Sequence, residues 1–127
     1  MRVGGRELTM KKVRFLWKST CSTCRDARQF LRDELHLELD ERNYAKEPLT
    51  LAELKEVFKN ADAREFINPK SPAFKARGLR GRPLTPAQAL KLMAEEPNLI
   101  KRPLVIVDGA IIAGFDRARL RADLAGR

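Results

Sequence analysis

Cys21 and Cys24, three positions apart, are the residues of this chain most suited to covalent chemistry. They are its only cysteines, and they lie in the stretch STCSTC, separated by Ser22 and Thr23. A thiolate attacks disulfides, and a second thiol one helical turn away displaces the group that the first has captured. The C-x-x-C spacing therefore predicts a reactive dithiol in which Cys21 is the nucleophile and Cys24 the resolving thiol.

The flanking segments place Cys21 at the start of a helix. VRFLW, residues 13 to 17, is short and mostly apolar, which is typical of a buried strand. Beyond Cys24, apolar residues recur at helical spacing, namely Ala27, Phe30, Leu31 and Leu35. Cys21 would lie at the strand-to-helix turn, where free amide N–H groups and the helix dipole stabilise a thiolate. Lys18 and Arg25 are close enough in sequence to add positive potential.

Two other roles for the cysteines stay open from the residues alone. Both could be small apolar side chains on a buried helix face, since free cysteine is commonly buried. A structural zinc site would need about four ligands, and His36 is the only other soft ligand of the chain. We expect His36 to be a solvent-facing residue at the helix end, and we expect no metal site.

A second element of interest is KRPLVIV, residues 101 to 107, in which Arg102 precedes Pro103. An X-Pro bond in front of an apolar strand can be cis, and a cis bond would present Arg102 toward the cysteine turn. The residues alone do not favour this arrangement over a simpler one, in which Pro103 is an ordinary proline at a strand start and Arg102 is solvated.

The remaining patterns complete an α/β order. LELDERN, residues 37 to 43, predicts a second strand, and AREFI, residues 63 to 67, a short helix. Capping boxes predict helices after Thr50 and Thr85. Residues 70 to 82 carry five basic residues and no acidic one, which indicates an exposed loop. Asp108-Gly109 between apolar runs predicts a hairpin, and Asp116 would cap a last helix. With C-x-x-C after the first strand, this order is that of a thioredoxin-like fold.

Length and composition indicate a single folded domain. The chain has 127 residues, 43% of them hydrophobic and 34% charged. We expect residues 1 to 11 to be a loose leader, and no apolar run approaches the roughly 20 residues of a membrane span. A cytoplasmic location follows as an expectation, and there a cysteine pair is more often redox-active than structural. The net charge of +9 favours anionic partners.

Four ordered motifs resemble the ArsC/Spx family, which contains glutaredoxin-linked arsenate reductases and Spx transcriptional regulators. The motifs are STCSTCRDARQFL, ERNYAKEPLTLAELKEVF, EFINPKSPAFKARGL and LIKRPLVIVDGAIIAGF, and the match runs from about residue 12 to 124. The resemblance implies a thioredoxin-like α/β fold with a mixed four-stranded sheet and an inserted helical subdomain over about residues 48 to 98. It also implies that Cys21 is the reactive cysteine, that Pro103 is cis, and that Arg102 faces Cys21.

Departures from the reductase pattern bear on the substrate. In these reductases two further arginines hold the oxyanion. In this chain Asn68 stands at the position of the first and the second falls near Gly114, so both arginines are missing. Lys70 is a nearby auxiliary cation. One flexible ammonium does not replace a guanidinium fork, which argues against arsenate as the native substrate. Cys24 resembles the second cysteine of the Spx C-x-x-C switch. In Spx a glycine-containing loop touches RNA polymerase, whereas KNADAREF, residues 59 to 66, has no glycine.

The resulting hypothesis is a monomeric, thiol-dependent oxidoreductase without a bound cofactor. Its electron donor would be glutathione, glutaredoxin or thioredoxin, and its partners would be thiol reductants, disulfide-containing proteins or a small oxyanion. A redox-sensing regulator that binds RNA polymerase is the alternative. A binding module without turnover is the third.

Overall fold

A four-stranded mixed sheet organises the chain, of which the computed structural model describes residues 13 to 124. The strands are β2 (Val13–Trp17), β3 (Leu39–Asn43), β4 (Leu104–Val107) and β5 (Ala110–Ala113), in the spatial order β3-β2-β4-β5. β2 and β3 run parallel, whereas β4 is antiparallel to both β2 and β5. The mixed four-stranded sheet is the one expected from the sequence. The expected leader, residues 1 to 11, lies outside the described residues.

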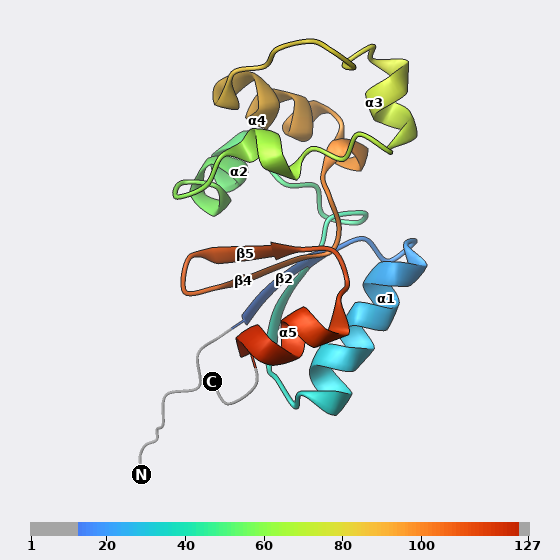
Figure 1. Ribbon diagram of the computed structural model, residues 1–127, viewed down its shortest axis with the longest axis vertical. Helices are drawn as coiled ribbons and strands as arrows, with labels where there is room; N and C mark the ends of the chain where they lie inside the picture. The colour runs from blue at the N-terminus through green and yellow to red at the C-terminus, as the bar shows by residue number, and fades with distance from the viewer. Residues whose placement is uncertain (1–12, 125–127) are drawn as a thin grey trace.

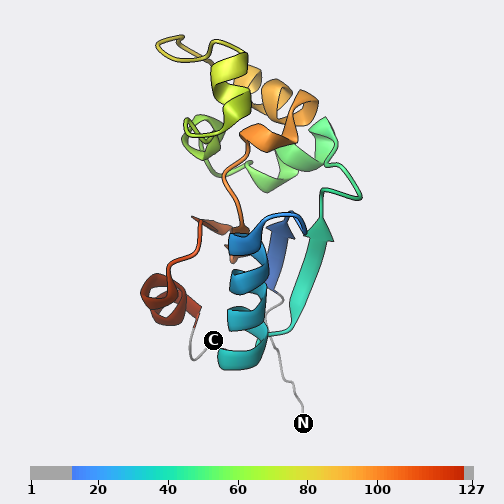
Figure 2. The ribbon, with the colours of Figure 1, turned by 90° about the vertical axis from the view of Figure 1, so that its right-hand side faces the viewer.

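Two helices cover one face of the sheet. α1 (Ser22–Gln29) and α5 (Arg117–Leu124) lie side by side below the strands in Figure 1, and Figure 2 shows α1 along the sheet. Side chains alternate between the faces of a strand, so one set from β2 and β4 points toward these helices. This core contains Val13, Phe15, Ala27, Phe30, Leu31, Val105, Val107, Ile112, Leu120 and Leu124.

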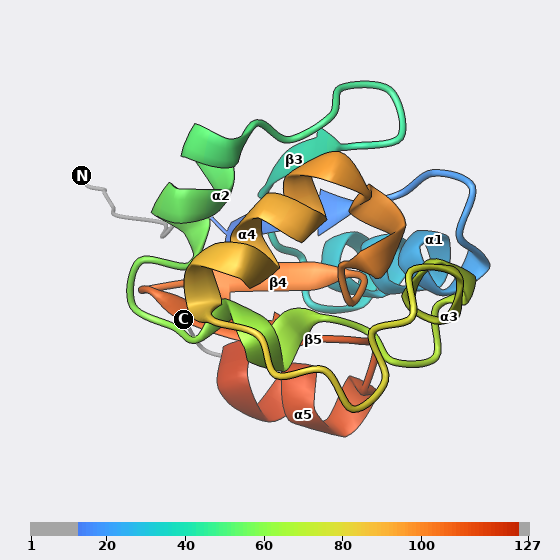
Figure 3. The same cartoon turned by 90° about the horizontal axis from the view of Figure 1, so that it is seen from above.

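The other face of the sheet carries the helical segment between β3 and β4. It contains α2 (Leu51–Val57), α3 (Pro72–Ala76), α4 (Pro86–Glu95) and short 3-10 turns at Ala63–Phe66 and Pro97–Leu99. Figure 3, seen from above, shows α2 and α4 over the strands. A second core joins this segment to the sheet, with Leu16, Leu104 and Ile106 from the strands packed against Leu54, Met93 and Ile100.

Local sequence signals account for the helix starts. Thr50 accepts a hydrogen bond from the Glu53 N–H while Glu53 accepts one from the Thr50 N–H, and Thr85 and Gln88 do the same in front of α4. These reciprocal bonds satisfy amide groups that have no partner within the helix. Both predicted capping boxes are therefore confirmed.

The hairpin and the last helix also begin as predicted. Asp108 and Gly109 have φ angles of 52° and 79°, the left-handed pair that a type I′ turn requires, and they join β4 to β5. The Asp116 carboxylate accepts a hydrogen bond from the Arg119 N–H at 3.1 Å, which caps α5.

Three local expectations need correction. Residues 70 to 82 are not simply an exposed loop, because Ser71 caps α3 and donates to the Asn98 carbonyl at 2.7 Å, and Leu79 is buried. The local sequence pattern of residues 70 to 82 does not indicate contacts with residues far away in the sequence, such as Asn98. The second strand begins at Leu39 rather than at residue 37. The first helix passes into a π-helical turn at Phe30–Glu34, which keeps Phe30 and Leu31 buried.

Candidate thiol redox site

Cys21 is the N-cap residue of α1, directly after the loop that leaves β2. Its backbone is extended, with φ −100° and ψ 118°, and its N–H donates to the Lys18 carbonyl at 2.9 Å. The Cys21 thiol is partly exposed, whereas Cys24 is 0% exposed one turn into the helix. Both are free thiols. The expected strand-to-helix placement of the pair is thus confirmed.

Arg102 comes to this pair from the far end of the sequence. It follows the Pro97–Leu99 turn, and the Arg102–Pro103 peptide bond is cis, as expected. Its guanidinium is half-buried, and Nη1 lies 3.5 Å from the Asn98 carbonyl oxygen. Burial lowers the pKa of Arg102, but Tyr44 and the two thiols outweigh it and hold that pKa above its ordinary value. The cation therefore persists beside the cysteines.

The thiolate of Cys21 is favoured by its surroundings. Partial burial by itself would raise the pKa of Cys21, but the backbone N–H and thiol of Cys24 and the guanidinium of Arg102 together lower it below its ordinary value. A hydrogen bond or a positive charge that stabilises only the ionised form acts in this direction. Since the attacking species is the thiolate, these surroundings favour reactivity at Cys21.

Cys24 has the opposite properties. Burial, followed by its proximity to Cys21, raises the pKa of Cys24 to about 12, against which the Lys18 N–H and Arg102 act. The buried thiol therefore stays protonated while Cys21 is reactive. Opposed pKa shifts in two adjacent thiols are compatible with one attacking and one resolving sulfur.

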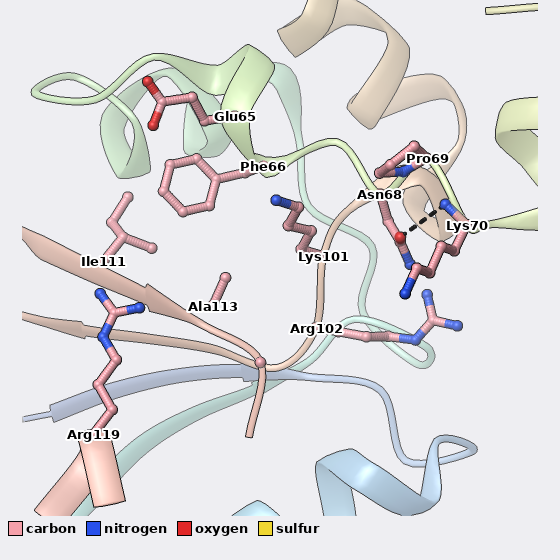
Figure 4. A pocket seen from close by; sticks show the side chains of 11 residues that line it. Glu65, Phe66, Asn68, Pro69, Lys70, Lys101, Arg102, Ile111, Ala113 and Arg119 are labelled. Atoms are coloured by element: carbon pink, nitrogen blue, oxygen red, sulfur yellow. Dashed lines mark hydrogen bonds between the residues drawn. The ribbon is translucent and has the colours of Figure 1, made fainter. Parts of the chain in front are cut away.

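A hollow of about 620 Å³ opens beside Arg102 (Figure 4). Lys70 and Asn68 line it beside Arg102. Gly114 also lines it, and its N–H donates to the Pro103 carbonyl at 2.9 Å. The structure thus brings Lys70 to the same hollow as Arg102, although the thiols are not among the lining residues. The positions expected to replace two reductase arginines, Asn68 and Gly114, both face this space.

Lys18 and Arg25 each donate a hydrogen bond to a fixed partner. The Lys18 ammonium lies 2.6 Å from Asn98 Oδ1, and Arg25 Nη1 lies 2.8 Å from the Ser19 carbonyl oxygen. Their expected addition of positive potential at Cys21 stays a prediction.

Asn98 is a site residue that sequence reasoning missed. Its side chain accepts from Lys18, and its carbonyl oxygen accepts from Ser71 and lies near Arg102. It thereby joins the cysteine loop, the helical segment and the Arg-Pro strand entry. The only sequence signal was its position four residues before Arg102, which indicates nothing by itself.

The described residues hold no group of three or more His, Cys, Asp or Glu side chains arranged to bind a metal ion. His36 is exposed at the end of the first helical segment, with a φ of 54°. Within residues 13 to 124, none of the helices is long and apolar enough to cross a membrane.

The fold and the C-x-x-C pair at a helix start define a thioredoxin-like protein. The ArsC family profile matches residues 16 to 122, and the chain belongs to this family. The global transcriptional regulator Spx of Listeria innocua is 30% identical over 110 residues, which are 85% of this chain and 83% of that protein.

Solved structures show the same architecture. An arsenate reductase related protein of Brucella melitensis is similar with a TM-score of 0.71 and 25% identity, over 91% of this chain and 97% of that one. The arsenate reductase of Vibrio cholerae is similar in fold, with a TM-score of 0.75 and 21% identity, over 91% of this chain and 99% of that one. The expected family and thioredoxin-like fold are confirmed.

Proposed function

We propose that this protein is a thiol-disulfide oxidoreductase in which Cys21 attacks and Cys24 resolves. The observation that carries this proposal is the contrast between the two thiols, one partly exposed with its pKa lowered and one buried with its pKa raised. Arg102 is the cation that stabilises the Cys21 thiolate, and the strand entry at Pro103 positions it. Lys70 is an auxiliary cation that lines the same hollow as Arg102.

The reaction proceeds in two exchanges. The Cys21 thiolate attacks a disulfide, forms a mixed disulfide, and releases one partner sulfur as a thiolate. Cys24 then loses its proton and attacks the Cys21 sulfur, so that a Cys21–Cys24 disulfide forms and the second partner sulfur leaves and is protonated. The partner gains two electrons, which the cysteine pair loses. An external thiol such as glutathione, glutaredoxin or thioredoxin restores the dithiol, in a monomer working in the cytoplasm.

The residues at the two positions where the reductases carry further arginines favour a disulfide over arsenate as the substrate. Arg102 is the guanidinium that acts on both thiols. Arg119 lines the hollow near Ile111, and Lys70 is exposed. A tetrahedral oxyanion is held best by planar forks that donate two parallel hydrogen bonds. Asn68 and Gly114 supply no such fork, so a small oxyanion would bind weakly.

Replacement of the nucleophile tests the proposal. We expect Cys21→Ser to reduce the steady-state rate of disulfide reduction by at least about 10³-fold, because a serine hydroxyl is not ionised at neutral pH. The assay follows reduction of a small disulfide with excess thiol reductant. Ser22→Ala is the matched control, since Ser22 is exposed beside Cys21 and should leave the rate within about twofold. Activity retained by Cys21→Ser would refute the proposed role.

A redox-sensing regulator is the second candidate, favoured by the 30% identity with Spx and by the resemblance of the C-x-x-C pair to the Spx switch. If it holds, immobilised protein should capture RNA polymerase from a bacterial lysate in one of its two oxidation states and at least about tenfold less in the other. Recovery would be compared after treatment with excess reductant and with a thiol oxidant. Equal recovery in both states, or none in either, contradicts a redox switch of polymerase binding.

A further inference from the structure

The cysteine loop, residues 18 to 21, and the strand entry, residues 98 to 103, are far apart in the sequence but joined by a hydrogen bond. The Lys18 ammonium donates to Asn98 Oδ1 at 2.6 Å. The carbonyl oxygen of the same Lys18 accepts from the Cys21 N–H at 2.9 Å. Lys18 therefore links the backbone of the nucleophile to the side chain of Asn98.

The strand entry is fixed on the helical segment through its main-chain atoms. The Asn98 carbonyl oxygen accepts from the buried Ser71 hydroxyl at 2.7 Å. Two residues further on, the Ile100 backbone pairs with that of Ile67 in an antiparallel bridge. Because these bonds need only the backbone of the strand entry, they persist when the Asn98 side chain is replaced.

The cysteine loop is held through side chains of its neighbours. The Ser19 N–H donates to Asn43 Oδ1 at 3.2 Å, which joins the loop to the end of β3. The bond from Lys18 to Asn98 joins it to the strand entry, and both of these side chains are half-buried. A hydrogen bond with a charged donor is shorter and stronger than one between neutral groups. This bond is therefore placed to fix the loop relative to the segment that carries Arg102.

We propose that Asn98 is a positioning residue, which holds the cysteine loop against the strand entry through Lys18 and so keeps the Arg102 guanidinium beside the Cys21 sulfur. This inference rests on the proposed function. Asn98 acts through its neighbours and neither gives nor takes a proton. In the first exchange the Cys21 thiolate bonds to one partner sulfur, and the other leaves with the electron pair of the broken disulfide bond. A reacting group is most effective when supporting hydrogen bonds keep it in its productive position.

Asn98→Ala removes the amide group that accepts from Lys18 and keeps the carbonyl that accepts from Ser71. The loop should then lie less firmly beside Arg102, which would stabilise the Cys21 thiolate less. At neutral pH we expect the variant to react about threefold to fivefold more slowly than the parent with a neutral pyridyl disulfide, a loss typical of one coupled contact. Its pH–rate profile should move to higher pH. The loss should not exceed that of Arg102→Gln.

A double-mutant cycle separates this role from a general loss of structure. In the Arg102→Gln background the guanidinium is already absent, so adding Asn98→Ala should change the rate by less than about 1.5-fold, whereas independent sites would add their effects. Asn60→Ala is the matched control, because Asn60 is an exposed asparagine of the helical segment and should leave the rate unchanged.

A second cycle tests the link itself. Lys18→Met removes the ammonium and keeps most of the side-chain stem. If Asn98 acts through its bond to Lys18, Asn98→Ala should have no further effect in the Lys18→Met background. This holds whether or not the charge of Lys18 also acts on Cys21 directly, because the comparison is made with that charge absent from both proteins.

Equal rates in Asn98→Ala and the parent, a faster variant, or a loss of the same size in all three backgrounds would overturn the inference about Asn98. The dithiol function would then still stand. If Cys21→Ser and the parent reduced the disulfide at equal rates, the dithiol function itself would be overturned.

Discussion

Cys24→Ser is expected to hold substrates on Cys21 as mixed disulfides that last at least about a hundredfold longer than in the parent protein. Intramolecular attack by a positioned thiol proceeds as if that thiol were highly concentrated, and the variant loses this route. The substitution should keep the packing, because a serine hydroxyl can accept the hydrogen bond that the Lys18 N–H directs at the Cys24 sulfur. Intact-mass measurement after exposure to a disulfide peptide gives the adduct and its lifetime.

Cys21→Ser is the matched control for this trap. It retains Cys24, whose thiol is fully buried and has its pKa raised to about 12 by burial and by Cys21. Replacement of Cys21 removes its effect on the pKa of Cys24, but burial still keeps that pKa raised. Cys24 should therefore form no adduct in the time that Cys21 takes to form one in Cys24→Ser. Digestion would assign the adduct of Cys24→Ser to the peptide that contains Cys21. An adduct on Cys24 in the control would contradict the division of roles between the two thiols.

Local sequence patterns predicted the parts of the fold that depend on interactions between residues close in sequence. The two capping boxes, the Asp108-Gly109 turn and the Asp116 cap each depend on residues within a few positions of one another. The placement of Cys21 followed from the change between strand and helix periodicity around it. Such features are decided before the chain packs.

Features that depend on distant partners were missed or misassigned. α3 was not foreseen although its start has local signals, namely the Ser71 cap and Pro72. The bond from Ser71 to the Asn98 carbonyl, 27 positions away, is the part that no local pattern shows. Tyr44 follows a strand that shows no clear alternation, and only the folded chain brings its hydroxyl to Arg102. From the residues alone, a cis Pro103 with Arg102 facing Cys21 and an ordinary proline with a solvated arginine were equally favoured. Only the family resemblance favoured the approach of Arg102 to Cys21. Local patterns carry no information on such pairs, which form only when the helical segment packs on the sheet.

Arg102→Gln should change how the reactivity of Cys21 depends on pH. Partial burial raises the pKa of Cys21, and Arg102 is among the groups that bring it below its ordinary value. Removal of the guanidinium should therefore raise the pKa of Cys21. The rate at which Cys21 reacts with a disulfide should then begin to increase at a higher pH in the variant than in the parent protein. At neutral pH we expect the variant to react about threefold to tenfold more slowly with a neutral pyridyl disulfide, because less of the thiol is ionised.

At alkaline pH Arg102→Gln should react faster than the parent protein, the reverse of the order at neutral pH. Once Cys21 is fully ionised in both, the more basic thiolate of the variant is the better nucleophile, since thiolate reactivity rises with thiol pKa with a Brønsted coefficient of about 0.4–0.5. The two pH–rate profiles should therefore cross. Loss of structure would lower the rate at every pH, so a crossing separates electrostatic stabilisation from damage. Arg77→Gln removes an equal charge from an exposed ion pair with Glu95 and should leave the profile unmoved. Profiles of Arg102→Gln and parent that coincide at all pH values would show that another group, rather than Arg102, stabilises the Cys21 thiolate.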